Sequence, residues 1–184
     1  MLVTPHYNDS RLLDALSSGQ LAVLRTDTLY GIVACASIQR AVENIFTLKG
    51  RSPDKPLIVL VASIDDIPNL SSNAKHTYER LNTLQPTSII VPSTHEPVWL
   101  TRGHGSVAYR VPHRRDLREL LAHSGPLVAP SANPQGLEPA RTIDHAISYF
   151  ADAISVYVDA GEVPEDTPPS TIIQLEGTAI KKLR

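Results

Sequence analysis

The chain has 184 residues, with 17 basic and 19 acidic side chains and a formal net charge of −2. This near-neutral charge argues against a bulk electrostatic attraction to nucleic acid or to an anionic membrane. The composition, 42% hydrophobic and 20% charged, is typical of a globular protein, and the single cysteine, Cys35, excludes an intramolecular disulfide.

Apolar residues recur with a helical period in five segments and form short apolar runs between them. Helices are expected at residues 10–18, 37–49, 72–84, 116–123 and 142–150, and strands at 21–24, 57–61, 88–91, 107–111, 127–129 and 156–158. Two further strands, 171–175 and 179–183, flank Glu176-Gly177 and predict a terminal hairpin. Because helices and strands alternate over short connections, the sequence predicts an α/β fold with a largely parallel or mixed twisted sheet, in one domain of residues 1–184.

The chain shows no sign of a membrane or secretion signal. Its first residues, MLVTPHYNDSRLL, lack a basic segment followed by an apolar one. The longest apolar run, Leu57 to Ala62, is far shorter than the about 20 residues that span a bilayer. We therefore expect a cytoplasmic protein without membrane contact. The acidic, proline-rich segment at 161–169, GEVPEDTPP, predicts a loop or lid, since it has little apolar surface to bury.

Common nucleotide and metal motifs are not found in the sequence. No GxxxxGK[ST] pattern occurs, which excludes a P-loop. Residues 103–108 imitate GxGxxA but precede a predicted strand instead of following one, so a dinucleotide-binding fold is not expected. The seven histidines show no HExxH spacing and have no CxxC partner, so we expect no structural metal site.

Polar and basic side chains gather at the ends of the predicted elements. Thr26-Asp27-Thr28 follows the first strand, Lys49-Gly50-Arg51 ends the second helix, and Ser131 and Asn133 follow the strand at 127–129. Ligands bind beyond the carboxyl ends of strands in open α/β sheets. Together with Arg110, these cations and neutral donors suit a phosphorylated ligand and a carboxylate-bearing partner. Each group also has a structural alternative, either a favourable helix-dipole interaction or a turn.

Six segments in chain order resemble the YrdC/TsaC family of threonylcarbamoyl-AMP synthases. They are TDTLYGI, KGR with SPDKPLIVL, YRVP, APSAN, PSTI and the closing LR. The resemblance covers residues 10–184 and implies a YrdC-like twisted mixed sheet with flanking helices and a concave basic cavity. It also implies the condensation of L-threonine, bicarbonate and ATP to threonylcarbamoyl-AMP and pyrophosphate, with Mg²⁺ bound with ATP. That reaction starts N6-threonylcarbamoyladenosine (t6A) synthesis at tRNA position 37.

The resemblance also implies roles for individual residues. The threonine-binding residues would be Thr28, Arg110, Ser131 and Ser170, and the ATP-binding residues Lys49, Arg51, Ser106, Asn133, Arg141 and Arg184. Lys49 and Arg51 would be the catalytic pair, because positioned cations stabilise charge on phosphate oxygens as pyrophosphate leaves. No protein nucleophile is needed, so Cys35 is expected in the core. The implied partners are the small-molecule substrates, with tRNA or a downstream threonylcarbamoyl-transferase complex beyond them.

Some positions depart from the family pattern. Arg25 replaces Pro, Asp27 replaces Glu, Lys55 replaces Asn, Leu60 replaces a histidine that would touch threonine, and Pro134-Gln135 replaces a segment with a second serine. We therefore expect threonine to be held by hydroxyls and Arg110, with weak affinity or relaxed selectivity toward serine, since one charge-assisted contact is lost.

Other functions remain open at this point. One is an O-carbamoyltransferase domain that forms carbamoyl-AMP, although such proteins are multidomain and carry CxxC zinc segments, whereas this chain has one cysteine. Another is a non-catalytic RNA-binding YrdC-like module. The net charge of −2 and the 5% aromatic content argue against it, because RNA recognition relies on basic surface and base stacking. A third is an α/β domain whose motif residues are structural.

Overall fold

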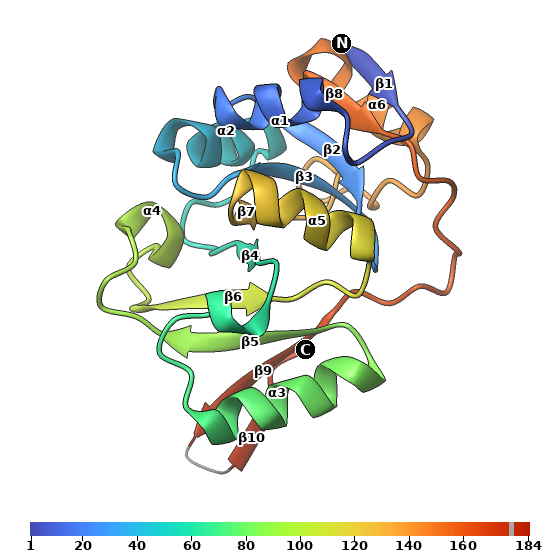
Figure 1. The fold of residues 1–184 in the computed structure, drawn as a ribbon. Coiled ribbons are helices and arrows are strands. Elements are labelled where there is room, and N and C mark those ends of the chain that lie inside the picture. The colour runs from blue at the N-terminus through green and yellow to red at the C-terminus, as the bar shows by residue number, and fades with distance from the viewer. Residues whose placement is uncertain (177–178) are drawn as a thin grey trace.

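The computed structural model describes residues 1–176 and 179–184, and for Glu176 the backbone alone. Helices pack around a long twisted sheet (Figure 1). The strands are β1 (Leu2–Thr4), β2 (Ala22–Arg25), β3 (Tyr30–Cys35), β4 (Ile58–Leu60), β5 (Thr87–Pro92), β6 (Ser106–Arg110), β7 (Leu127–Val128), β8 (Val156–Val158), β9 (Thr171–Glu176) and β10 (Ala179–Lys182). The helices are α1 (Ser10–Ser17), α2 (Gln39–Lys49), α3 (Ser72–Leu84), α4 (Val98–Thr101), α5 (Arg115–Ser124) and α6 (Ile143–Phe150), with 3₁₀ turns η1 (Ile64–Asp66) and η2 (Ala151–Ala153). No helix in this described part is long and apolar enough to cross a membrane.

The described strands form one sheet in the order β1-β8-β2-β3-β7-β4-β6-β5-β9-β10. Neighbours pair in parallel at β1–β8, β2–β8, β4–β6 and β5–β9, and antiparallel elsewhere. The predicted mixed sheet of an α/β fold is therefore confirmed. The predicted terminal strands pair as β9 and β10, while Gly177 of the predicted turn lies outside the described residues.

Two apolar cores lie on the two faces of the sheet. One contains Ile45 of α2 and Phe150 of α6, and the other contains Leu16 of α1 and Leu117 of α5. Successive side chains of a strand point to opposite faces, and in β4 the buried Val59 and Leu60 accordingly belong to different cores. Figure 1 shows α5 crossing the sheet beside β3 and β7. Burial on both faces explains why the strands read as nearly continuous apolar runs.

Two helix ends follow directly from local sequence. Thr142 caps α6 by accepting a backbone hydrogen bond at 3.1 Å. Gly50 closes α2 with φ at 61°, a left-handed conformation that suits a residue without a Cβ atom. The sequence pattern places the N-cap of α2 near Ser37, whereas Ile38 takes that position, one residue later. The helix begins at Gln39, and its first turn has no side-chain cap.

The sequence patterns missed β1, β3 and α4. All six residues of β3 are buried, but the segment, YGIVAC, contains glycine and alanine, which give a weak intrinsic strand signal. Its conformation depends on antiparallel pairing with β2 on one side and β7 on the other. Helix α4 is a single turn inside the loop predicted between β5 and β6.

Candidate active site

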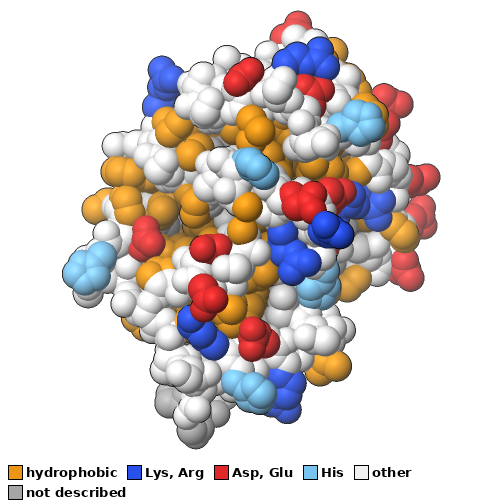
Figure 2. Space-filling model, in the orientation of Figure 1, with side chains coloured by type: hydrophobic (Ala, Val, Ile, Leu, Met, Phe, Trp, Pro, Cys, Tyr) orange, Lys and Arg blue, Asp and Glu red, His pale blue; other side chains and the backbone are white. Residues whose placement is uncertain are grey.

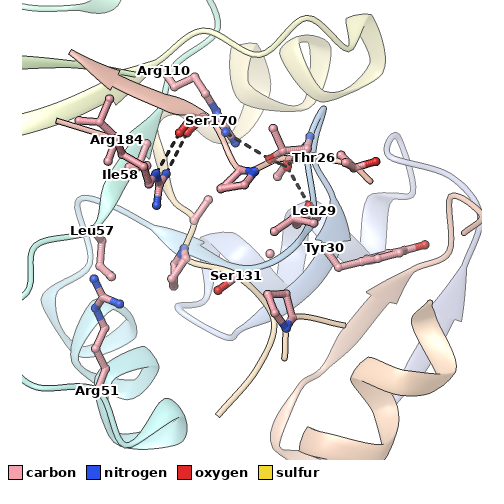
Figure 3. Close-up of a pocket in the computed structure, with 18 of the residues that line it drawn as sticks. Thr26, Leu29, Tyr30, Arg51, Leu57, Ile58, Arg110, Ser131, Ser170 and Arg184 are labelled. Carbon is pink, nitrogen blue, oxygen red and sulfur yellow. Dashed lines mark hydrogen bonds between the residues drawn. The ribbon is translucent and has the colours of Figure 1, made fainter. Parts of the chain in front are cut away.

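A cavity of about 430 Å³ opens at the middle of the sheet (Figure 3). Its walls come from the β2–β3 turn, the α2–β4 connection, the end of β6, the β7–α6 connection, the segment into β9, and Arg184. The lining residues are Thr26, Thr28, Leu29, Tyr30, Gly31, Arg51, Pro56, Leu57, Ile58, Arg110, Ala129, Pro130, Ser131, Glu138, Pro139, Arg141, Thr167, Pro169, Ser170, Ile172 and Arg184. Four of these are arginines and one, Glu138, is acidic, so the cavity is basic.

Three of the arginines donate to backbone carbonyls at the cavity wall, and Arg141 does so from Nη1 to the Pro164 carbonyl. Arg51 donates from Nε to the Lys55 carbonyl and from Nη2 to the Pro56 carbonyl, both at 3.1 Å. Arg184 donates from Nε to the Ser170 carbonyl at 3.0 Å. Burial lowers the pKa of the Arg51 and Arg184 guanidinium groups, and the nearby charge of Arg110 lowers that of Arg184 further. Cations crowded into a partly dehydrated cavity favour an anionic ligand, which would relieve their mutual repulsion.

The inner end of the cavity combines Arg110 with hydroxyl groups. Arg110 is 4% exposed; its Nη1 donates to Oγ1 of Thr28 at 3.4 Å, and its Nη2 lies 3.7 Å from Oδ1 of Asp27. Among the described residues, Nε of Arg110 and Oδ1 of Asp27 have no hydrogen-bond partner. The Thr26 hydroxyl donates to the Leu29 carbonyl at 2.8 Å, so Thr28 is the donor in the 3.0 Å contact between the two threonines. The guanidinium thus keeps donor capacity for a small carboxylate.

Ser131 lines the cavity, whereas Lys49 and Asn133 lie behind it. The Lys49 ammonium donates to the carbonyl oxygens of Ser131 and Asn133, both at 2.5 Å. The lysine is 4% exposed, so Lys49 is a buried cation at the end of α2 and not a surface one. Burial, with a smaller effect of the Arg51 charge, lowers the pKa of Lys49 to about 8, which leaves it mainly protonated at neutral pH.

The other predicted residues divide in the same way. Seven of the predicted site residues come together around the cavity: Thr28, Arg51, Arg110, Ser131, Arg141, Ser170 and Arg184. Ser106 is the first residue of β6, paired in register with Pro92, and is not part of the lining. Sequence reasoning did not single out Tyr30 and Glu138; Tyr30 lies within the TDTLYGI motif that could have indicated it, while Glu138 carries no such signal.

The segment at 161–169 forms one side of the cavity through Thr167 and Pro169. The prediction that it has little to bury is wrong at Val163, which is fully buried and donates its backbone N–H to the Arg141 carbonyl at 2.8 Å. Ser170 is already 2% exposed, with its Oγ 3.2 Å from that of Ser88. Both ends of the segment are therefore anchored, and closure over the cavity would be confined to residues 164–169.

The fold and the cavity define an α/β protein whose pocket, lined by arginines and hydroxyl groups, suits small anionic ligands. A model of the Sua5/YciO/YrdC family, described as telomere recombination, matches residues 14–184. The chain belongs to that family.

Individual relatives extend over most of the chain. A candidate threonylcarbamoyl-AMP synthase of Mycobacterium tuberculosis is 37% identical over 92% of this chain and 80% of that protein. The threonylcarbamoyl-AMP synthase of Aliivibrio fischeri is 28% identical over 90% of this chain and 92% of its own. Among solved structures, Sua5 of Pyrococcus abyssi complexed with L-threonine superposes with a TM-score of 0.87 at 28% identity, covering 100% of this chain and 57% of that one.

Proposed function

We propose that the protein is a threonylcarbamoyl-AMP synthase, a nucleotidyltransferase that converts L-threonine, bicarbonate and ATP to threonylcarbamoyl-AMP and pyrophosphate. The observation that carries the proposal is a single basic cavity with two different ends. One end pairs Arg110 with hydroxyl groups, and the rest presents arginines from three separate segments. The names of relatives that match about 90% of the chain support the same activity.

The inner end would bind threonine. The carboxylate of the amino acid would pair with the Arg110 guanidinium, while Thr28, Ser131 and Ser170 offer hydroxyls for the amino and side-chain groups. Leu60, at the position of the missing histidine, is fully buried in the core that contains α5 and pairs in register with Arg110. It supplies no polar contact, so the expectation of weak affinity or relaxed selectivity toward serine stays a prediction.

The arginines would bind the phosphates of ATP. The threonine amine and bicarbonate form a carbamate with loss of water. A carbamate oxygen then attacks the α-phosphorus, and the bond between that phosphorus and pyrophosphate breaks. Arg51, Arg141 and Arg184 would stabilise the charge that spreads over the phosphate oxygens, and holding both substrates together removes an entropic barrier. Lys49, Ser106 and Asn133 lie outside the lining, and their predicted ATP contacts stay predictions.

Magnesium fits this cavity as part of the nucleotide substrate. Glu138 is the one carboxylate that lines the described cavity, and no cluster of three His, Cys, Asp or Glu side chains in the described residues could hold a metal ion. Mg²⁺ usually keeps several waters and binds through substrate phosphates with one or two carboxylates. We infer that it arrives on ATP, with Glu138 available for a water-mediated contact.

Mass spectrometry of the protein incubated with ATP, threonine and bicarbonate tests the proposal. Threonylcarbamoyl-AMP and pyrophosphate are the expected products. Carbamoyl-AMP formed only from carbamoyl phosphate would indicate the O-carbamoyltransferase activity, and RNA binding without any adenylate would indicate a binding module. Delivery of the product to a downstream transferase complex that modifies tRNA is part of the proposal, as is a single domain spanning residues 1–184.

A further inference from the structure

The ammonium group of Lys49 lies in a polar site formed by residues 131–133, next to the cavity-lining Ser131. Besides the two backbone carbonyls at 2.5 Å, Nζ lies 3.3 Å from Oδ1 of Asn133, which accepts a third hydrogen bond. An ammonium group has three donors and no acceptor. All three are therefore committed to residues 131–133, and none remains for a phosphate in the cavity.

Asn133 is held in one orientation by these contacts. Its Nδ2 donates to the carbonyl oxygens of Pro134 at 3.1 Å and Leu137 at 2.6 Å. The amide of Asn133 faces two carbonyl acceptors on one side and the Lys49 ammonium donor on the other. These partners fit only the assignment with the nitrogen toward the carbonyls and the oxygen toward Lys49. Oδ1 of Asn133 therefore faces both Lys49 and the hydroxyl of Ser131.

The orientation of Asn133 decides the role of the Ser131 hydroxyl. Oγ of Ser131 donates to Oδ1 of Asn133 at 2.6 Å. Because a hydroxyl has one proton, this bond leaves its lone pairs for the cavity that Ser131 lines. The hydroxyl is thus an acceptor toward the ligand, and its partner must be a donor such as an amine or a hydroxyl.

We propose that Lys49 is a positioning residue that acts through Asn133 to hold the Ser131 hydroxyl as a hydrogen-bond acceptor for the amino-acid substrate. The inference rests on the proposed function, which supplies an amino acid with amine and hydroxyl donors. It also explains why a lysine is buried at the end of α2, since the loop carbonyls and the Asn133 amide oxygen compensate its charge. Without the ammonium, the two carbonyls lose their partner and the amide is free to rotate.

The loop remains attached to α2 when the ammonium is removed. The Lys49 carbonyl accepts from the backbone N–H of Gln135 at 2.7 Å, and the backbone N–H of Ser52 donates to Oε1 of Gln135 at 3.1 Å. Lys49→Met keeps these contacts and an apolar side chain of similar length. We therefore expect this variant to fold, which circular dichroism and thermal melting can verify.

A double-mutant cycle tests the proposal by calorimetric titration with L-threonine and, separately, with a non-hydrolysable ATP analogue. Lys49→Met should weaken threonine binding about tenfold, the scale of one hydrogen bond to a charged group. In a Ser131→Ala background the same change should alter threonine affinity by less than about twofold, because the group it positions is gone. Nucleotide affinity should stay within about twofold of wild type. Lys75→Met, which removes a lysine of α3 that pairs with Asp65 of η1, is the matched control and should change neither affinity.

Three results would overturn the inference. These are an equal loss of threonine affinity in both backgrounds, an unchanged threonine affinity, and a loss confined to the nucleotide, which would assign Lys49 to the phosphates. If Lys49→Met does not fold, Asn133→Ala replaces it in the cycle and should show the same dependence on Ser131. Wild-type protein that binds no threonine would refute the proposed function itself. Threonine binding by wild type with a failed cycle would refute the positioning role alone.

Discussion

Replacing Arg110 by methionine should separate the binding role of this residue from its structural role. Arg110 and Asp27 are each 5% exposed in their side chains and lie 3.7 Å apart without a direct hydrogen bond. Breaking a well-formed buried ion pair costs about 3–5 kcal/mol because the remaining charge is left unpaired. The long distance between Nη2 of Arg110 and Oδ1 of Asp27 places this pair at the lower end of that energy range. Arg110→Met should therefore reduce the free energy of unfolding by about 3 kcal/mol. Part of the Asp27 charge stays compensated by the backbone N–H of His113 at 3.4 Å.

The double variant Asp27→Asn with Arg110→Met removes both charges and should recover most of the lost stability. It should still bind threonine poorly, because a hydrogen bond to a charged group contributes about 1.5–3 kcal/mol, or about 10- to 150-fold in affinity. Urea denaturation measures the first quantity, and calorimetric titration with threonine measures the second. Threonine affinity within about threefold of wild type in the double variant would refute the role of Arg110 in carboxylate binding.

Four further outcomes are expected. Arg51→Ala should abolish most ATP-dependent product formation while changing the free energy of unfolding by less than about 1 kcal/mol; near-normal turnover would remove Arg51 from the phosphate site. Deleting Arg184 should raise the KM for ATP without unfolding the protein, and an unchanged KM would contradict its contact with the nucleotide. Amides of residues 164–169 should gain protection from hydrogen exchange when ATP and threonine are both present, whereas equal exchange would identify a static connector. Burial lowers the pKa of Lys49 from 10.5 to about 8, so the unfolded chain binds more protons than the folded one between these two pH values. The contribution of Lys49 to the free energy of unfolding should therefore rise with pH from about 8 to 10.5. Denaturation of wild type and Lys49→Met over that range checks this, since the variant should lack the rise.

Elements whose signals are local could be predicted from the sequence. The hydroxyl of Thr142 and the conformational freedom of Gly50 act within a few residues, so the start of α6 and the end of α2 are where the pattern placed them. The strand β3 could not be found in this way. Its backbone is extended because it pairs with β2 and β7, and β7 begins about ninety residues further along the chain.

The sequence by itself determined which chemical groups the candidate site contains: arginines, hydroxyls and a segment rich in proline before Ser170. Only the tertiary structure decided which of them face the cavity. Lys49 and Arg51 stand two positions apart, yet Arg51 lines the cavity while Lys49 is buried behind it. The reason is that the acceptors of the Lys49 ammonium lie 82 and 84 residues away along the chain. Helical period and capping depend on neighbours in sequence, whereas the desolvation and hydrogen-bond partners of a charged group depend on the segments that folding brings against it.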